Sequence, residues 1–149
     1  MTEERDIKTM KLYHHFERVD NELRHAGFKD DDKLRPEDLF AFDNMNYYGT
    51  EAVQNAIDCC KIDQNCKVLD IGSGLGGPAR FMASKTGCEV FALELQEDCS
   101  RKAFEYTERC TMTENIHHIT DDFLRCDLEH TGTRAIDTSY VCTSFSFPR

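Results

Sequence analysis

The segment Lys67-Val-Leu-Asp-Ile-Gly-Ser-Gly-Leu-Gly-Gly-Pro-Ala-Arg80 constrains the fold of this chain more than any other part of the sequence. Its apolar residues Val68, Leu69 and Ile71 form the short run that is typical of a β-strand covered on both faces. Glycines then let the backbone turn sharply and let a ligand approach without meeting a Cβ atom. The pattern predicts a strand, a ligand-binding turn and the start of a helix, as in an α/β fold with a parallel sheet.

The glycine spacing alone leaves the class of ligand open. Gly72-x-Gly74-x-x-Gly77 fits the fingerprint of a dinucleotide-binding turn, but Asp70 lies two residues before the first glycine. A carboxylate there would repel a pyrophosphate, whereas a cofactor with an ammonium and a sulfonium, such as S-adenosylmethionine, would be attracted to it. A nicotinamide or flavin site and a glycine-rich connection without a ligand are the alternatives.

The sequence around the turn predicts further strands and helices. Pro78 fits the first turn of a helix that runs to about Lys85, because its missing N–H costs nothing there. A crossover this short places the next strand beside the first and parallel to it. The remaining predicted elements are a helix at 51–61, a strand at 89–94, a helix at about 97–109, a strand at 115–120 and a candidate fourth strand within 135–147.

Acidic residues stand at the ends of the later strands as well. Glu94 closes the second strand, where its carboxylate can accept hydrogen bonds from both ribose hydroxyls of a nucleoside. Asp121 and Asp122 directly follow the third strand. A solvated acid at a strand end and a pair of capping acids in a loop are the simpler interpretations of these residues.

The N-terminal part of the sequence predicts a helical cap, residues 1–42, in front of a Rossmann-like cofactor-binding domain, residues 43–149. Apolar residues recur at helical spacing over about 7–25, with charged residues on the other side. Pro36 marks a second helix start. That these residues merely cover one face of the sheet is an equally good interpretation.

The string LDIGSGLGGPARFMA, then Glu94 and later ITDDFL, resemble the first three binding motifs of class I S-adenosylmethionine-dependent methyltransferases. DNMNYYGTEAV at 43–53, followed by the glycine turn, is most similar to small-molecule N-methyltransferases of the sarcosine/dimethylglycine and phosphoethanolamine types. The resemblance covers about 43–127. It implies a Rossmann-like parallel sheet, S-adenosyl-L-methionine as the cofactor, and methyl transfer to a small-molecule acceptor such as an amine.

The resemblance also implies which residues contact the cofactor. Asp122 would accept a hydrogen bond from the adenine amino group and Phe123 would flank the base, although Asp121 stands where these relatives often have glycine. Tyr48 would lie near the cofactor, unless Tyr47 and Tyr48 pack the cap against the body. No catalytic base is assigned. The predicted contacts are Asp70, Gly72, Ser73, Gly74, Gly76, Gly77, Glu94, Leu95, Asp122, Phe123, Tyr48 and Gly49.

Net charge, apolar runs and cysteine spacing limit the classes of partner that this chain can have. A net charge of −10 over 149 residues argues against nucleic acid, because phosphate backbones require patches of Lys and Arg. No apolar run is long enough for a bilayer span, and the N-terminus lacks the character of a signal peptide. The eight cysteines show no zinc-type spacing, so we expect reduced thiols, no metal and a cytoplasmic location.

The C-terminus prompts one more expectation. The resemblance implies a seven-stranded sheet, but the sequence stops at Arg149, soon after the candidate fourth strand. We therefore expect a chain truncated at its C-terminus or completed by another chain, with self-association through an open sheet edge or apolar face. A cofactor-binding fragment or pseudoenzyme without turnover is the leading alternative, and a nicotinamide-dependent oxidoreductase is the second.

Overall fold

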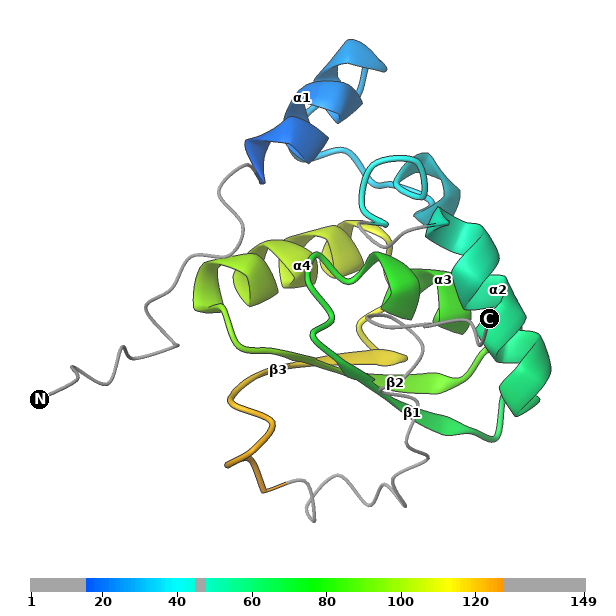
Figure 1. Cartoon of the computed structure of the whole chain (residues 1–149). Helices are drawn as coiled ribbons and strands as arrows, with labels where there is room; N and C mark the ends of the chain where they lie inside the picture. Colours follow the sequence, from blue (N-terminus) through cyan, green and yellow to red (C-terminus); the bar gives the residue numbers. More distant parts are fainter. Residues whose placement is uncertain (1–15, 45–47, 128–149) are drawn as a thin grey trace, which may run out of the picture.

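The computed structural model describes residues 16–44 and 48–127, and within them a parallel sheet forms the centre of the fold (Figure 1). Its strands are β1 (Lys67–Ile71), β2 (Glu89–Glu94) and β3 (Ile116–Thr120), in the order β1-β2-β3. Lys67 pairs with Glu89, and Val90 pairs with Ile116. The predicted α/β fold is confirmed, as is the parallel placement of the second strand beside the first.

Helices alternate with these strands where the sequence predicts them, within two residues at each end. Pro36 begins only a single 3-10 turn rather than a longer helix. Residues 7–15 of the first predicted helix and the candidate fourth strand lie outside the described residues. The helices are α1 (Glu17–His25), η2 (Pro36–Asp38), α2 (Gly49–Cys60), α3 (Gly77–Thr86) and α4 (Glu97–Arg109).

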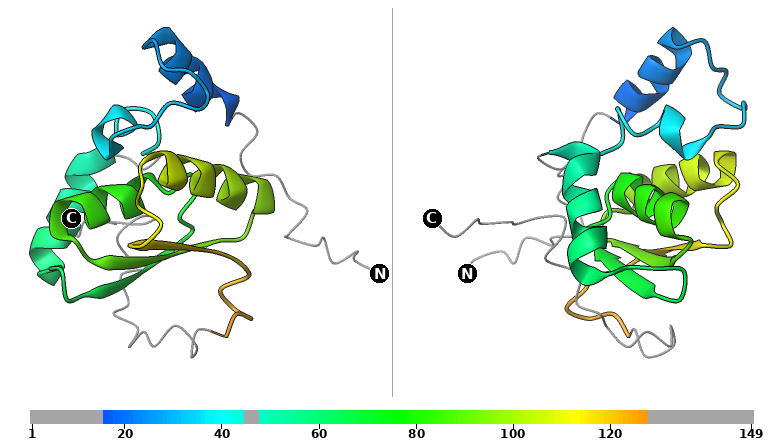
Figure 2. Two further views of the ribbon diagram at one scale, coloured as in Figure 1. Left: turned by 180° about the vertical axis from the view of Figure 1, so that it is seen from behind. Right: turned by 90° about the vertical axis from the view of Figure 1, so that its right-hand side faces the viewer.

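Two helices, α3 and α4, cover one face of the sheet, and α2 packs beside α3 next to β1 (Figures 1 and 2). Side chains alternate between the two faces of a strand, so Val68 and Val90 enter the core beneath these helices. Leu69 and Phe91 point to the opposite face and form a separate apolar cluster. The carboxyl ends of all three strands meet at one edge of the sheet, where the predicted site lies.

The described part of the N-terminal cap packs on helices. In both figures α1 lies beyond α4, on the side away from the sheet. Apolar side chains of the cap and of α4 form one buried cluster, which we call the cap cluster. Leu75 of the glycine turn belongs to it, so the cap packs on the turn as well. This arrangement differs from the interpretation in which the cap covers a sheet face. The buried members of this cap cluster are Val19, Leu23, Leu34, Leu39, Leu75, Cys99, Tyr106 and Cys110.

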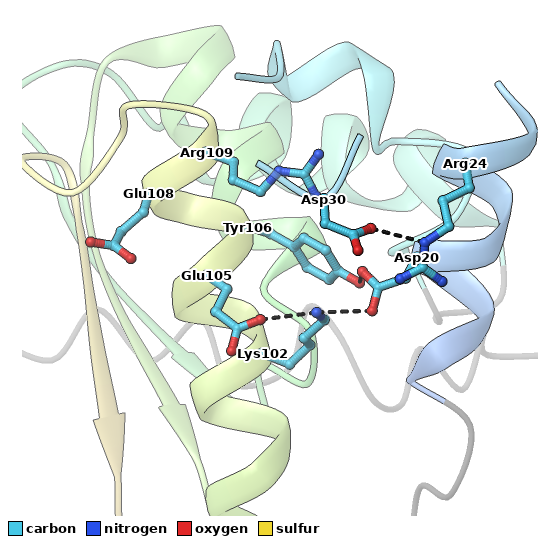
Figure 3. Close-up of a pocket in the computed structure, with 8 residues that line it drawn as sticks. All are labelled: Asp20, Arg24, Asp30, Lys102, Glu105, Tyr106, Glu108 and Arg109. Atoms are coloured by element: carbon cyan, nitrogen blue, oxygen red, sulfur yellow. Dashed lines mark hydrogen bonds and ion pairs between the residues drawn. The ribbon is translucent and has the colours of Figure 1, made fainter. Parts of the chain in front are cut away.

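A polar pocket of about 370 Å³ lies between α1 and α4 (Figure 3). Lys102 contacts Asp20 at 2.9 Å, and the Tyr106 hydroxyl donates a hydrogen bond to Asp20 at 2.8 Å. Burial raises the pKa of Tyr106, which keeps this phenol protonated as a donor. Arg24 and Asp30 pair at 2.9 Å on the same wall. None of the predicted cofactor residues lines this pocket. Its polar contacts join the cap to α4.

Two further features concern only the described ranges, 16–44 and 48–127. No helix there has both the length and the apolar character to cross a membrane. Seven cysteines carry free thiols, and Cys142 lies outside the described residues.

Candidate functional site

The end of β2 holds the first half of the glycine turn. The N–H groups of Gly72 and Ser73 both donate to the carbonyl oxygen of Leu93, at 2.8 and 3.0 Å. The N–H of Gly74 donates to Oε2 of Glu94 at 2.9 Å. Gly72 and Gly74 have φ values of +70° and +54°, a left-handed conformation that glycine adopts without steric cost. The protein itself therefore sets the shape of the turn.

Glu94 is a buried acid, with only 7% of its surface exposed. Its Oε2 accepts from Gly74, and its Oε1 accepts from the N–H of Gln96 at 2.9 Å. The interpretation of Glu94 as a solvated acid is therefore wrong. A carboxylate oxygen has two lone pairs, so each still has one for a ribose hydroxyl. That contact stays a prediction, and the sequence missed the second role of Glu94 as the anchor of the turn.

Acids from all three strands gather at this edge. Asp70, on β1, is 4% exposed and pairs in the sheet with Ala92 of β2. Asp121, which follows β3, donates its N–H to the carbonyl oxygen of Glu94 at 3.2 Å. Negative charge at adjoining strand ends, part of it buried, favours a cationic ligand over an anionic one.

The turn is exposed at Gly72 and carries a buried hydroxyl beside it, at Ser73. The hydroxyl of Ser73 is buried and has no hydrogen-bond partner among the residues that the structure describes. A buried hydroxyl without a partner is costly, so a ligand that supplies one would be stabilised here. A Cβ atom added to Gly72 would meet no atom of the described residues within 4 Å. A ligand can therefore approach the backbone at this point.

Gly76 and Gly77 instead face other parts of the protein. A Cβ atom on Gly76 would lie 3.0 Å from a guanidinium nitrogen of Arg80 and 3.1 Å from the His118 ring. A Cβ atom on Gly77 would lie 2.5 Å from the carbonyl oxygen of Asp43. Close packing against backbone explains why glycine is needed at position 77, and at position 76 a left-handed φ of +75° adds to the close packing. The predicted contact of both glycines with a cofactor stays a prediction.

Sequence reasoning missed a buried ion pair behind the turn. Arg80 and Asp43 lie 2.9 Å apart, and both side chains are 0% exposed. The one signal for Arg80 is its position on α3 between Ala79 and Phe81, which are both buried. A charged residue within an apolar stretch of helix predicts a buried partner, but not which one.

His118, on β3, belongs to the same buried region. Its Nε2 lies 2.9 Å from the Thr107 hydroxyl, and Arg80 is close enough to repel a proton on the ring. Burial, reinforced by Arg80, lowers the pKa of His118 to about 4 from 6.5. The imidazole is therefore neutral at physiological pH.

We expect the low pKa of His118 to make stability depend on pH. In the unfolded chain the ring binds a proton below about pH 6.5, but in the folded chain only below about pH 4. The unfolded state therefore binds more protons in this window, and stability falls as the pH falls through it. Urea unfolding across the window would show a shallower pH slope for His118→Gln than for wild type. Equal slopes would contradict the assigned pKa.

The loop after β3 holds its acids within its own turn. Oδ1 of Asp122 accepts the N–H of Leu124 at 3.0 Å, and Oδ1 of Asp121 accepts the N–H of Asp122 at 2.7 Å. These bonds are the capping role considered as the alternative for both acids. Phe123 is 46% exposed. The contacts of Asp122 and Phe123 with adenine stay predictions.

The remaining predicted contacts lie on either side of the turn in sequence. Tyr48 has a φ of +71° and is 73% exposed, so its ring does not pack the cap against the body. Gly49 begins α2 directly after it, whereas Tyr47 lies outside the described residues. Leu95 is half-buried next to Glu94. The contacts of Tyr48, Gly49 and Leu95 with a cofactor stay predictions.

Comparisons with known proteins point to one class. No family model matches the chain. It is 32% identical over 69 residues to the sterol 24-C-methyltransferase of Debaryomyces hansenii, a match that covers 46% of this chain and 18% of that protein. It is 37% identical over 62 residues to the sterol 24-C-methyltransferase of Saccharomyces cerevisiae, which covers 42% and 16%. The chain thus matches less than a fifth of the length of these relatives.

Among solved structures, the fold resembles an RNA methyltransferase from Salinibacter ruber in complex with S-adenosyl-L-homocysteine. The TM-score is 0.50 at 19% identity, and the match covers 52% of this chain and 51% of that one. This likeness shows a Rossmann-like fold. Together with the curated relatives, it supports the resemblance to class I S-adenosylmethionine-dependent methyltransferases, but not the narrower one to sarcosine or phosphoethanolamine enzymes.

Proposed function

We propose that this chain is the cofactor-binding part of an S-adenosylmethionine-dependent methyltransferase and that it binds this cofactor at the carboxyl edge of its sheet. The similarity to sterol 24-C-methyltransferases and the Rossmann-like fold support the class of enzyme. The chemistry of the turn supports the cofactor, because buried acids and an open glycine face suit a cationic nucleoside better than a pyrophosphate.

One observation carries the choice of cofactor. A pyrophosphate site requires backbone N–H groups that point at the ligand. In this turn the N–H groups of Gly72, Ser73 and Gly74 already donate to Leu93 and to the Glu94 carboxylate. That carboxylate would also repel a phosphate brought to the turn. These contacts weigh against the nicotinamide-dependent oxidoreductase.

The residues present fit the proposed cofactor. Each carboxylate oxygen of Glu94 accepts one hydrogen bond from the described residues and would accept a second from a ribose hydroxyl. The Ser73 hydroxyl, which has no partner among those residues, would bond to a polar group beside them. Asp70 would add favourable charge near the cationic end. When bound, the cofactor supplies an electrophilic methyl group, and the protein contributes alignment and exclusion of water.

For the acceptor, we propose a small molecule. The net charge of −10 supports this choice over nucleic acid. The curated relatives are named for methylation at carbon 24 of a sterol and give no support to an amine. The amine acceptor therefore stays a prediction from the sequence resemblance.

Calorimetric titration tests the proposed cofactor without requiring turnover. We expect S-adenosylhomocysteine to bind with a Kd of about micromolar order, and NADH at the same concentrations to give no heat beyond dilution. Binding of NADH together with no binding of S-adenosylhomocysteine would overturn the proposal.

A further inference from the structure

The Arg80 guanidinium uses every donor that it has. An arginine side chain carries five N–H bonds. Its Nε and one terminal nitrogen donate to Oδ2 of Asp43, at 3.3 and 2.9 Å, and the same terminal nitrogen donates to the carbonyl oxygen of Leu75. The other terminal nitrogen donates to the carbonyl oxygen of Ala103 at 3.1 Å and to the hydroxyl of Thr107 at 3.0 Å.

These five bonds join three separate parts of the fold. Asp43 directly follows the cap, Leu75 lies in the glycine turn, and Ala103 and Thr107 lie on α4. The Leu75 side chain is itself buried in the cap cluster. Glu94 therefore anchors the turn at Gly74, and Arg80 anchors the residue that follows it.

We propose that Arg80 is a positioning residue that holds the second half of the turn in its cofactor-binding shape, an inference that rests on the proposed function. Arg80 is fully buried behind the turn and acts on the cofactor through the Leu75 backbone. Its loss would free Leu75 to move relative to Gly74 and Glu94. Cofactor affinity then depends on the guanidinium as well as on the glycines.

The number and geometry of the bonds explain why lysine cannot substitute for arginine here. Lysine retains the positive charge opposite Asp43, but it has only three donors and they do not lie in a plane. With three donors in place of five, at least two of the five hydrogen bonds would be lost, and at least one of the four acceptors would lose its partner. Because buried polar networks are costly when only partly satisfied, we expect the turn to shift rather than stay in place.

The decisive experiment compares two matched arginine variants by calorimetry with S-adenosylhomocysteine, at a temperature where circular dichroism shows each to be folded. We expect Arg80→Lys to bind roughly 10- to 100-fold more weakly than wild type, since small misplacements in a site cost about this much. Arg109→Lys is the control, because Arg109 also ties the cap to α4, through the carbonyl oxygens of Asp32 and Lys29, without touching the turn. It should lower the melting temperature and leave Kd unchanged.

A second variant covers the case in which Arg80→Lys does not fold. Thr107→Val keeps the side-chain shape and removes one acceptor of Arg80, so we expect a folded protein with binding several-fold weaker than wild type. For Arg80→Ala, guanidinium added far below denaturing concentrations should partly restore affinity, which a general loss of stability would not allow.

The outcomes separate the two proposals. No binding by wild type would refute the proposed function. Wild-type binding with unchanged affinity in folded Arg80→Lys, or in Thr107→Val if the former does not fold, would overturn the role of Arg80. An equal loss of affinity in Arg109→Lys would do so too, because it would assign the effect to docking of the cap in general.

Discussion

Replacement of Glu94 by alanine is expected to abolish measurable binding of S-adenosylhomocysteine and to lower the free energy of unfolding by about 3 kcal/mol. The physical reason is that the buried carboxylate accepts the N–H groups of Gly74 and Gln96. Without it, both donors lose their partner, and each such buried group costs roughly 1–3 kcal/mol. The turn then loses its shape at the same time as the site loses its ribose acceptor.

The matched control is Glu94→Gln, which keeps the shape of the side chain. An amide has only one acceptor oxygen, so its NH₂ group would face one of the two backbone donors. We expect binding to be lost here as well, with a smaller loss of stability than in Glu94→Ala. Calorimetry and urea unfolding of both variants give the two measurements. Wild-type affinity in Glu94→Ala would remove Glu94 from the cofactor site.

Replacement of Gly77 by alanine should destabilise the fold by about 3 kcal/mol, at the upper end of the usual range for overpacking. The added Cβ atom would lie 2.5 Å from the carbonyl oxygen and 2.7 Å from the carbonyl carbon of Asp43. These are backbone atoms, which cannot rotate away as a flexible side chain can. The segment that carries Asp43 must move off α3, and the ion pair with Arg80 weakens with it.

Gly72→Ala is expected to lose less stability than Gly77→Ala but to lose more cofactor affinity. Its Cβ atom meets no neighbour in the described part of the chain, so the cost is the strain of a left-handed alanine, about 1–2 kcal/mol. The methyl group, however, enters the open face of the turn. Gly27→Ala, with a φ of +93° and equally open space in the cap, is the control for strain alone and should leave Kd unchanged.

Thermal melts and calorimetry on these three variants decide the roles of the glycines. We expect Gly77→Ala to have the lowest melting temperature of the three variants. For each degree by which the melting temperature falls, Gly72→Ala should lose more affinity than Gly77→Ala. If Gly72→Ala binds as tightly as Gly27→Ala, the open face of the turn is not where the cofactor lies.

Local signals were sufficient for the architecture. The apolar run at 67–71, the glycine turn and Pro78 mark a strand, a connection and a helix start by their own stereochemistry. The short crossover to the strand at 89–94 then leaves parallel, adjacent pairing as the favoured arrangement, and the structure has it. The length of the helix that begins at Pro36 was not predictable, since a proline at this position fits a 3-10 turn as well as a longer helix.

For the site, the sequence predicted the positions of the acids but not their partners. The ends of parallel strands meet at one edge, so Asp70 and Glu94 had to lie near the turn once the sheet formed. That both would be buried, and that Glu94 would accept N–H groups from the turn, depends on how far the turn folds back over β2. No local pattern encodes that distance.

The sequence by itself determined the order of strands and helices, the glycine turn and the charge at the strand ends, because these follow from backbone stereochemistry and side-chain periodicity within a few residues. Only the tertiary structure decided that Gly77 packs against the backbone of Asp43, and that Arg80 pairs with an aspartate 37 residues away. Burial gives such residues their roles, and burial is a property of the assembled layers. A charged residue can stay in the interior only where the fold brings enough partners to it.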